Sequence, residues 1–257
     1  MNRLQQKLND KKENLLSIYF TAGYPQLNDT GIIIKELEAS GVDIIEVGMP
    51  FSDPVADGPT IQASSLKALN NGMSVSLLLK QLKAIKNEVN IPILLMGYIN
   101  PIWKYGVEKF MADCEDAGVS GLILPDVPLD EFKTNYQALY EKHKLSSVFL
   151  ITPQTSNERI KAYDEVCTGF IYMVSSASTT GSDKIADQQK QETYYNRVKS
   201  LGLKNSTLIG FNIKNKTSFN RACSYSSGGI IGSAFIKKIS EEGELKANTN
   251  EFILSIR

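Results

Sequence analysis

The sequence predicts one α/β domain over residues 1–257, a closed (β/α)8 TIM barrel with an extra N-terminal helix and a short extra helix after strand two. Eight short apolar segments recur along the chain, and a helical pattern follows each of them. The segments are nearly continuous apolar runs, as expected of parallel strands that are buried on both faces. Eight such units close most naturally as a barrel, and the length of 257 residues suits one barrel of about 250 residues. An open doubly wound sheet is the alternative, although no G-x-G-x-x-G follows the first strand.

Local signals place the boundaries of the elements. Residues 1–13 form an amphipathic pattern with Leu4 and Leu8 on one face, and the sequence AGYP ends the first strand. Asn28 or Asp29 can cap the helix that follows. The expected strands cover residues 15–21, 43–47, 91–98, 121–126, 146–152, 170–175, 206–211 and 228–234. The expected helices after the first cover residues 29–41, 60–70, 75–85, 107–116, 129–143, 157–167, 186–201, 218–223, 235–242 and 248–257. No linker or low-complexity segment divides the chain.

Composition excludes several classes of function. Hydrophobic residues make up 42% and charged residues 22% of the chain, which is ordinary for a globular protein. Lys and Arg number 28, as do Asp and Glu, so no overall basic field attracts nucleic acid. No apolar run approaches the roughly 20 residues that span a bilayer, and the N-terminal segment lacks the apolar core of a signal peptide. We therefore expect a cytoplasmic protein.

Cysteine and histidine usage narrows the chemistry. Cys114, Cys167 and Cys223 are odd in number and widely spaced, which fits buried reduced thiols better than disulfides or a zinc motif. The one histidine, His143, lies in a polar EKHKL segment and is expected at the surface. These counts argue against Ser–His–Asp, Cys–His and histidine-based metal chemistry, and no metal site is predicted. Acid–base chemistry would use carboxylates, tyrosines or lysines.

Glu46 and Asp57 are the candidate catalytic residues. Glu46 stands inside an otherwise apolar strand, where an ionised carboxylate costs several kcal/mol unless it is solvated, paired or neutralised. Asp57 follows in a loop that three prolines stiffen. Two carboxylates held across a small cavity can have their pKa values pushed apart, which suits acid–base catalysis. The alternative is that Glu46 is structural, bonded to backbone amides or facing water.

Barrel active sites lie at the carboxyl ends of the strands, which selects further candidates. Tyr19, Tyr98 and Tyr172 stand near the ends of strands one, three and six, and Asp126 ends strand four. Several aromatic side chains in one barrel mouth would suit a flat aromatic ligand. Ordinary core packing is the alternative for each tyrosine taken alone.

A phosphate site is expected at the ends of strands seven and eight, where barrels commonly bind phosphate. Glycines let backbone amides approach an anion, and a helix N-terminus supplies unpaired N–H groups. The loop 175–184 is rich in Ser, Thr and Gly and is a candidate lid over that phosphate. Structural turns and an ordinary solvent loop are the alternatives. The residues concerned are Thr180, Gly181, Gly210, Asn212, Gly232 and Ser233.

The stretch IEVGMPFSDPVADGPTIQ, residues 45–62, closely resembles the signature of the tryptophan synthase alpha subunit family. The resemblance extends over nearly the whole chain, through FTAGYP, LLMGYINP, LILPDVP, the strand of Tyr172, the pair Gly210–Phe211 and IGSA. Two departures stand out. Asn212 replaces a glycine found in many relatives, which can restrain φ. The lid reads Ser-Thr-Thr-Gly at 178–181 where Gly-Val-Thr-Gly is common.

The resemblance implies cleavage of indole-3-glycerol phosphate to indole and glyceraldehyde 3-phosphate. Glu46 and Asp57 match the family's catalytic carboxylates: Glu46 would protonate indole C3 and later accept the glycerol hydroxyl proton, while Asp57 would bond the indole N–H. Tyr172 matches a residue of the indole pocket, and Gly181, Gly210, Gly232 and Ser233 match phosphate contacts. No metal or organic cofactor is implied in this chain.

The resemblance also implies a pyridoxal-phosphate-dependent beta subunit as partner, in a heterotetramer of two alpha and two beta chains. The loop 50–59 puts apolar residues around Asp53 at the barrel mouth, and residues 100–103 and 127–128 are expected on neighbouring rim loops. Gathered apolar side chains on one rim favour a docking surface. The residues assigned to this interface are Asp53, Pro54, Asn100 and Pro128.

Three rival functions remain open from the sequence. The chain could be a self-sufficient lyase that releases free indole without a partner. It could be another phosphosugar isomerase or synthase on the same barrel. It could also be a non-catalytic regulatory subunit, although intact Glu46 and Asp57 argue against that reading.

Overall fold

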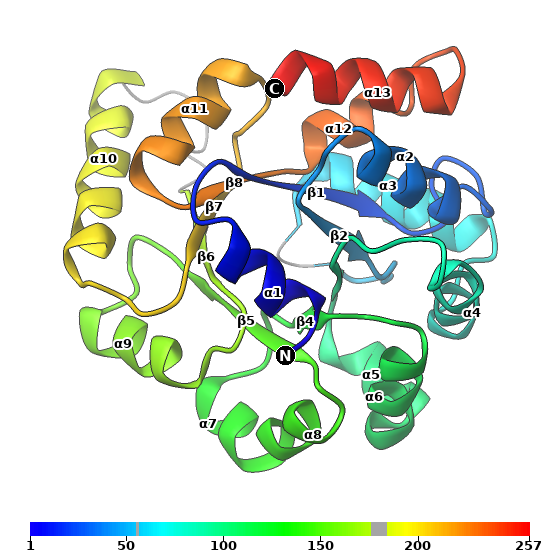
Figure 1. The fold of residues 1–257 in the computed structure, drawn as a ribbon, viewed down its shortest axis with the longest axis horizontal. Coiled ribbons are helices and arrows are strands. Elements are labelled where there is room, and N and C mark those ends of the chain that lie inside the picture. Colours follow the sequence, from blue (N-terminus) through cyan, green and yellow to red (C-terminus); the bar gives the residue numbers. More distant parts are fainter. Residues whose placement is uncertain (55–56, 176–183) are drawn as a thin grey trace.

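Eight parallel strands close into a barrel in sequence order, and β8 pairs with β1 to complete it. The structure is a computed structural model that describes residues 1–54, 57–175 and 184–257. Helices surround the strands as an outer ring (Figure 1). This arrangement confirms the predicted TIM barrel with its extra N-terminal helix and its short helix after the second strand.

Every predicted strand and helix is present, but the third, fourth and eighth strands are shorter than predicted and the helix expected at 129–143 is divided into three parts. The strands are β1 (Leu15–Thr21), β2 (Ile44–Gly48), β3 (Ile93–Met96), β4 (Gly121–Ile123), β5 (Ser146–Ile151), β6 (Ile171–Val174), β7 (Thr207–Gly210) and β8 (Gly228–Ile231). The helices of the first half are α1 (Arg3–Asp10), α2 (Thr30–Ala39), α3 (Pro59–Asn70), α4 (Val75–Ile85), α5 (Ile99–Tyr105) and α6 (Val107–Asp116). Those of the second half are α7 (Leu129–Glu131), the π-helical turn η1 (Phe132–Tyr136), α8 (Gln137–Lys142), α9 (Asn157–Val166), α10 (Lys184–Ser200), α11 (Lys216–Tyr225), α12 (Ser233–Lys238) and α13 (Leu245–Ile256).

The segment after β3 corrects the sequence prediction. Residues 99–105 form helix α5, where rim loop was expected for residues 100–103. Pro101 is tolerated because it lies in the first turn, where backbone N–H groups have no partner within the helix. Ile102 is consequently buried against the barrel, whereas Trp103 on the same helix is 54% exposed.

The alternation of side chains along the strands divides the core into two layers. On β1, Leu15 points into the barrel and packs with Ile44 and Phe170, while Leu16 and Ile18 pack outward against the helices. The same alternation places Ser17, Tyr19 and Thr21 on the inner face. The inner layer therefore changes along β1 from apolar to polar in the direction of its carboxyl end.

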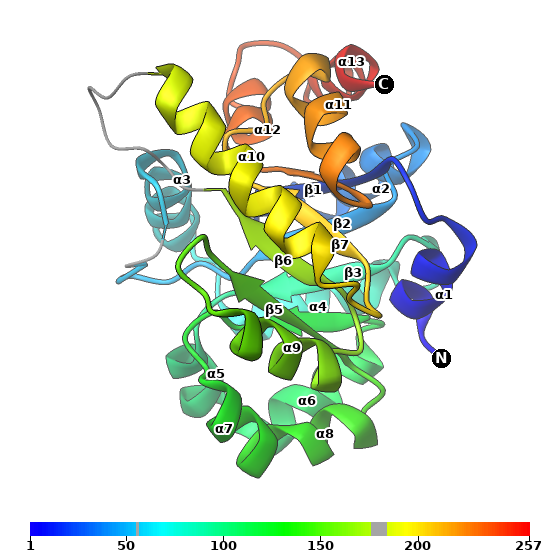
Figure 2. The same cartoon turned by 90° about the vertical axis from the view of Figure 1, so that its left-hand side faces the viewer.

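Helix α1 closes the amino-terminal end of the barrel. Its buried Leu4 and Leu8 join the inner core cluster. The Asn2 side chain caps the helix by accepting from the Gln5 amide, 3.1 Å away. Its Nδ2 atom donates to the carbonyls of Ser120 and Lys144, both at 2.8 Å. In Figure 2, α1 lies on the opposite side of the molecule from α3, so the other end of the barrel is left for a binding site.

Asp43 joins both ends of the chain to the barrel. Its carboxylate accepts from Lys11 Nζ at 2.7 Å, from the Leu16 amide at 2.9 Å and from Arg257 at 2.5 Å. Burial raises the pKa of Asp43, but the hydrogen bonds from Lys11, Leu16 and Arg257 outweigh burial and hold it below the ordinary value. The carboxylate thus connects the segment after α1, strand β1 and the end of α13.

Candidate active site

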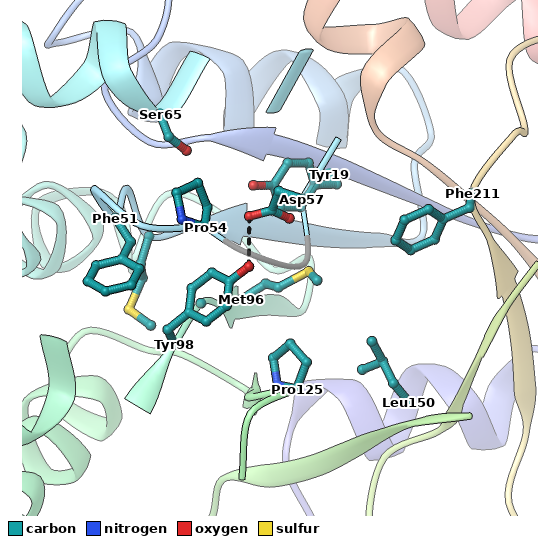
Figure 3. Close-up of a pocket in the computed structure, with 12 residues that line it drawn as sticks. Tyr19, Phe51, Pro54, Asp57, Ser65, Met96, Tyr98, Pro125, Leu150 and Phe211 are labelled. Carbon is teal, nitrogen blue, oxygen red and sulfur yellow. Dashed lines mark hydrogen bonds between the residues drawn. The ribbon is translucent and has the colours of Figure 1, made fainter. Parts of the chain in front are cut away.

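A cavity opens at the carboxyl ends of the strands and contains about 450 Å³ of empty space, part of it open to solvent. Its walls are mostly apolar or aromatic, and Figure 3 shows Asp57 and Tyr98 pointing toward each other inside it. The lining residues are Tyr19, Met49, Phe51, Pro54, Asp57, Ser65, Met96, Gly97, Tyr98, Pro125, Leu150 and Phe211. Such walls with a few polar groups suit a flat apolar ligand that carries one or two hydrogen-bonding atoms.

Glu46 is fully buried and is not itself among the residues that line the cavity. Strand β2 places it in register with Tyr19 of β1, which lines the cavity wall. Its Oε1 atom accepts a hydrogen bond from Ser17 Oγ at 2.7 Å, whereas its buried Oε2 atom has no partner among the described residues. Burial raises the pKa of Glu46 to about 7, against the smaller lowering effect of the Ser17 hydrogen bond. This carboxyl can therefore hold or release a proton at neutral pH.

Asp57 lies on the loop between β2 and α3 and is half-buried. Its Oδ2 atom accepts from the Tyr98 hydroxyl at 3.2 Å, the contact drawn in Figure 3. Burial raises the pKa of Asp57, and the hydrogen bond from Tyr98 acts in the opposite direction. Tyr98 itself packs against Phe51, with ring centroids 5.3 Å apart.

Tyr19 and Tyr172 join the two carboxylates into one cluster. Burial raises the pKa of each hydroxyl, and the nearby charges of Asp57 and Glu46 raise both further. Each ring fits because the neighbouring strand carries a glycine. A Cβ atom at Gly48 would lie 2.2 Å from the Tyr19 hydroxyl oxygen, and one at Gly210 would lie 2.3 Å from that of Tyr172. Gly210 is thus required for packing, a role that nothing in its sequence context marks.

The loop after β7 is held in an unusual conformation. Phe211 and Asn212 have φ values of 68° and 59°, in the left-handed region. Asparagine tolerates this region well, so the substitution for glycine at 212 keeps the conformation that glycine would favour. The Ser175 hydroxyl donates to the carbonyls of Gly210 and Phe211, at 3.1 and 2.9 Å. These bonds tie the loop to the end of β6.

The candidate phosphate residues occupy the neighbouring strand ends. Gly232 precedes helix α12, and Ser233 is the first residue of that helix and is exposed. Asn212 is exposed on the loop after β7. Thr180 and Gly181, together with the rest of residues 176–183 of the candidate lid, lie outside the described residues. Gly210, Asn212, Gly232 and Ser233 therefore stand at the carboxyl ends of the adjacent strands β7 and β8.

The residues assigned to a partner interface lie on segments at the carboxyl ends of the strands. Asp53, Asn100 and Pro128 are exposed, and Pro54 is partly exposed where it lines the cavity. Asn100 lies in the first turn of α5 rather than in a loop, and Pro128 precedes α7.

Two smaller expectations were wrong. Asp126 does not end β4, which stops at Ile123; it lies in the following loop and accepts from the Ile99 amide at 3.0 Å, where it caps α5. His143 is not a surface residue but is buried, and its Nδ1 atom lies 2.9 Å from Glu115 Oε2. It stands just before β5, at the end of the barrel away from the cavity.

The part of the chain that the structure describes does not meet the requirements of a metal site, a membrane-spanning helix or a disulfide. Within residues 1–54, 57–175 and 184–257, no three His, Cys, Asp or Glu side chains are grouped as a metal site would require. None of the helices in that part of the chain is long and apolar enough to cross a membrane. Cys114 and Cys167 are buried free thiols, as predicted, and Cys223 is partly exposed.

Comparison with known proteins points to one family. Residues 5–255 match the sequence model described as tryptophan synthase alpha chain. The tryptophan synthase alpha chain of Flavobacterium psychrophilum is 58% identical over 95% of each chain. That of Flavobacterium johnsoniae is 56% identical over the full length of both.

Solved structures agree with the sequence comparison. Tryptophan synthase subunit alpha from Legionella pneumophila superposes with a TM-score of 0.89 at 30% identity, covering 100% of this chain and 97% of that one. A chain of tryptophan synthase from M. tuberculosis, in an aminoacrylate-bound form, superposes with a TM-score of 0.85 at 32% identity, covering 100% of both chains.

Proposed function

This chain belongs to the tryptophan synthase alpha chain family, and from that premise we propose that Glu46 and Asp57 carry out its chemistry. The chain is a carbon–carbon lyase of tryptophan biosynthesis, which cleaves indole-3-glycerol phosphate to indole and glyceraldehyde 3-phosphate. The observation that carries the residue assignment is the buried Oε2 of Glu46, which has no partner among the described residues, on the strand position paired with Tyr19, a residue of the cavity wall.

Glu46 acts first as an acid and then as a base. Its protonated carboxyl delivers a proton to indole C3, which makes that carbon tetrahedral and leaves positive charge on the ring. The carboxylate then accepts the proton of the glycerol hydroxyl next to the breaking bond. As the C–C bond breaks, its electron pair returns to the indole ring and the hydroxyl carbon becomes the aldehyde. A pKa of about 7 suits both steps, because neither protonation state is strongly disfavoured at neutral pH.

Asp57 stabilises the charge that develops on the ring. Its carboxylate accepts the indole N–H while Tyr98 holds it in place. An ionised carboxylate in a mostly apolar cavity interacts strongly with a nearby positive charge, because little water screens the pair. The indole ring would lie among Tyr19, Tyr98 and Tyr172, whose rings supply flat apolar surface.

Replacing either carboxyl tests these roles. We expect Glu46→Gln and Asp57→Asn each to lower kcat by roughly 10²-fold or more, the usual contribution of one acid–base group. Asp130→Asn is the matched control, because this exposed carboxylate lies in α7, after β4, and should leave kcat unchanged. Indole release from indole-3-glycerol phosphate is the measurement, with circular dichroism to confirm folding. Near-normal turnover by a folded Glu46 or Asp57 variant would refute the assignment.

The phosphate of the substrate is proposed to bind at Gly210, Asn212, Gly232 and Ser233, with Thr180 and Gly181 supplied by the loop after β6. Support comes from the glycines at two adjacent strand ends and from the position of Ser233 at the start of α12. A negative charge at Ser233 should repel the phosphate. Ser233→Asp is expected to raise KM about 10-fold or more, whereas Ser224→Asp, at the far end of α11, should not. Equal KM values for the two variants would place the phosphate elsewhere.

The rim around the cavity is proposed to dock a pyridoxal-phosphate-dependent beta subunit, which gives a heterotetramer of two alpha and two beta chains. Asp53, Pro54, Asn100 and Pro128 lie on segments that follow the carboxyl ends of the strands, and Pro54 lines the cavity. Trp103 on α5 is exposed. Asp53 is only four residues from Asp57 in the sequence, so a partner that binds Asp53 would influence the position of the catalytic carboxylate. Asp53→Ala should weaken activation by the partner and spare the basal rate. Titration with the beta subunit, followed by light scattering, tests this; absence of a complex would favour a free-standing lyase.

A cytoplasmic location is proposed as well, in keeping with the composition of the chain and its free thiols. Fractionation of cells that make the protein tests it, and recovery with the membrane or secreted fraction would contradict it.

A further inference from the structure

Ser17 stands out among the inner residues of β1. It lies between Leu15, which packs in the apolar inner layer, and Tyr19, which lines the cavity. The side chain is fully buried, and its hydroxyl donates to Glu46 Oε1 at 2.7 Å. A buried hydroxyl is costly unless it is hydrogen-bonded, and the bond to Glu46 meets that need.

The hydrogen bond makes the two oxygens of Glu46 unequal. Oε1 is occupied as an acceptor, while Oε2 is buried and has no partner among the described residues. When the carboxyl is protonated, Oε1 still accepts from Ser17, so the proton resides on Oε2. Rotation about the terminal bond of glutamate has a broad, two-fold profile, which means that nothing in the side chain itself would fix this arrangement.

The surroundings of Glu46 leave Ser17 as its main polar neighbour. Strand β3 contributes Leu94 and Met96 to the inner layer, and neither carries a charge. The titratable groups that face the cluster are Tyr19 from β1, Tyr172 from β6, Asp57 from the loop after β2 and Tyr98, which directly precedes α5. Tyr19 and Tyr172 remain neutral because burial raises the pKa of both hydroxyls. No cation of the described residues is among the causes that shift the pKa of Glu46.

We propose that Ser17 is a positioning residue for the lyase reaction, which anchors Oε1 of Glu46 and so makes Oε2 the atom that exchanges protons with the substrate. This inference rests on the proposed function of Glu46. Without the Ser17 donor the carboxyl rotates between two orientations, and only a fraction of molecules hold the proton where indole C3 can receive it. The donor also favours the ionised carboxylate, which sets the pH at which the acid form is lost.

Substitution of Ser17 tests the proposal through a pH profile. Ser17→Ala is expected to lower kcat about 10-fold. It should also shift the alkaline limb of the kcat/KM profile to higher pH by roughly one unit. The sign follows from the lost hydrogen bond, because its removal disfavours the ionised form and raises the pKa of Glu46. Ser17→Thr keeps the donor and should retain the native limb. Ser147→Ala is the matched control, because it removes another buried serine hydroxyl from a strand. That hydroxyl bonds the Val166 carbonyl and the Thr168 hydroxyl, and not Glu46.

A second measurement does not depend on turnover. Glutamate labelled with ¹³C at the carboxyl carbon reports each titration by NMR, and the Glu46→Gln variant identifies the signal of Glu46. The Glu46 signal should titrate at higher pH in Ser17→Ala than in the native chain and should be unmoved in Ser147→Ala. If Ser17→Ala does not fold, Ser17→Cys takes its place, because the thiol has similar volume and is a weak donor.

The outcomes separate this proposal from the one on which it rests. An active Glu46→Gln variant would overturn the proposed function itself. An inactive Glu46→Gln variant together with native kcat and a native pH limb in Ser17→Ala would overturn only the role of Ser17. A lower kcat with an unmoved limb and an unmoved Glu46 titration would reduce Ser17 to a packing residue and also refute the proposal.

Discussion

At the scale of single residues, the burial of Glu46 lowers the stability of the fold but also gives its carboxyl the pKa that catalysis needs. Its carboxyl is removed from water inside a barrel whose neighbouring side chains are mostly apolar. Burial favours the neutral acid, and the single hydrogen bond from Ser17 does not compensate. The same burial that gives the carboxyl a proton at neutral pH therefore destabilises the fold whenever that proton is lost.

The pH dependence of stability should reveal this cost. The folded-state pKa of Glu46, about 7, exceeds the ordinary value of 4.5, so the native chain binds the proton more tightly than the unfolded chain does. Stability should consequently fall as pH rises from about 4.5 to about 7 and then level off, by an amount on the order of 3 kcal/mol. Glu46→Gln should lack this decline. Urea unfolding between pH 4 and pH 8 measures it, and parallel curves for the two proteins would contradict the expectation.

The sequence predicted the residues whose types are unusual for their position. A glutamate in an apolar strand is visible without a structure, and so is a proline-rich loop that carries Asp57. Ser17 was missed because a serine within a buried strand has no distinctive pattern, and its importance depends on a partner 29 residues away. Phe211 was missed as a cavity residue because its direction depends on a left-handed backbone that the sequence does not mark.

At the scale of elements, the alternation of apolar runs and helical patterns predicted the barrel because every parallel strand is buried on both faces. Helix α5 was the exception. Its sequence INPIWKY contains proline and few of the apolar spacings of a helix, and its N-terminal amide is bonded by Asp126, 27 residues later. A helix that depends on a distant carboxylate cannot be recognised from its own residues.

Helix α1 gives a prediction at the same scale. Asn2→Ala removes both the cap of α1 and the donors to Ser120 and Lys144, and should lower the free energy of unfolding by about 2–3 kcal/mol. Asn2→Asp keeps the capping oxygen and should lose about half as much. Asn9→Ala, on the exposed end of the helix, is the control. Equal stability of Asn2→Ala and the native chain in urea would show that the hydrogen bonds of Asn2 contribute nothing to the stability of this end of the barrel.

At the scale of the whole molecule, Asp43 holds together segments from both ends of the chain. Lys11 follows α1, Leu16 lies in β1 and Arg257 follows α13, and all three donate to one buried carboxylate. An ion pair of this kind is costly to break from one side, because the remaining charges lose their partner. The N-terminal and C-terminal segments are thus expected to loosen together when Asp43 is removed.

Asp43→Asn should lower the free energy of unfolding at pH 7 by roughly 3 kcal/mol. The folded-state pKa of Asp43 lies below the ordinary 3.8, so its contribution is present above that value and is lost as pH falls through the depressed pKa. The difference between variant and native chain should therefore shrink in acid. Asp10→Asn, an exposed carboxylate in α1, serves as control. A difference that stays constant from pH 7 to pH 2 would argue against the ionic contribution.

The fit between Gly210 and Tyr172 constrains how this enzyme can change over generations. The Tyr172 hydroxyl occupies the space that a methyl group at 210 would need. A lineage that first acquired alanine at 210 would meet a clash, whereas one that first exchanged tyrosine for a smaller side chain would leave room for it. The two positions therefore accept mutations in one order only, and Gly48 with Tyr19 forms a second such pair. The routes by which the pocket could adapt to another ring system are correspondingly few.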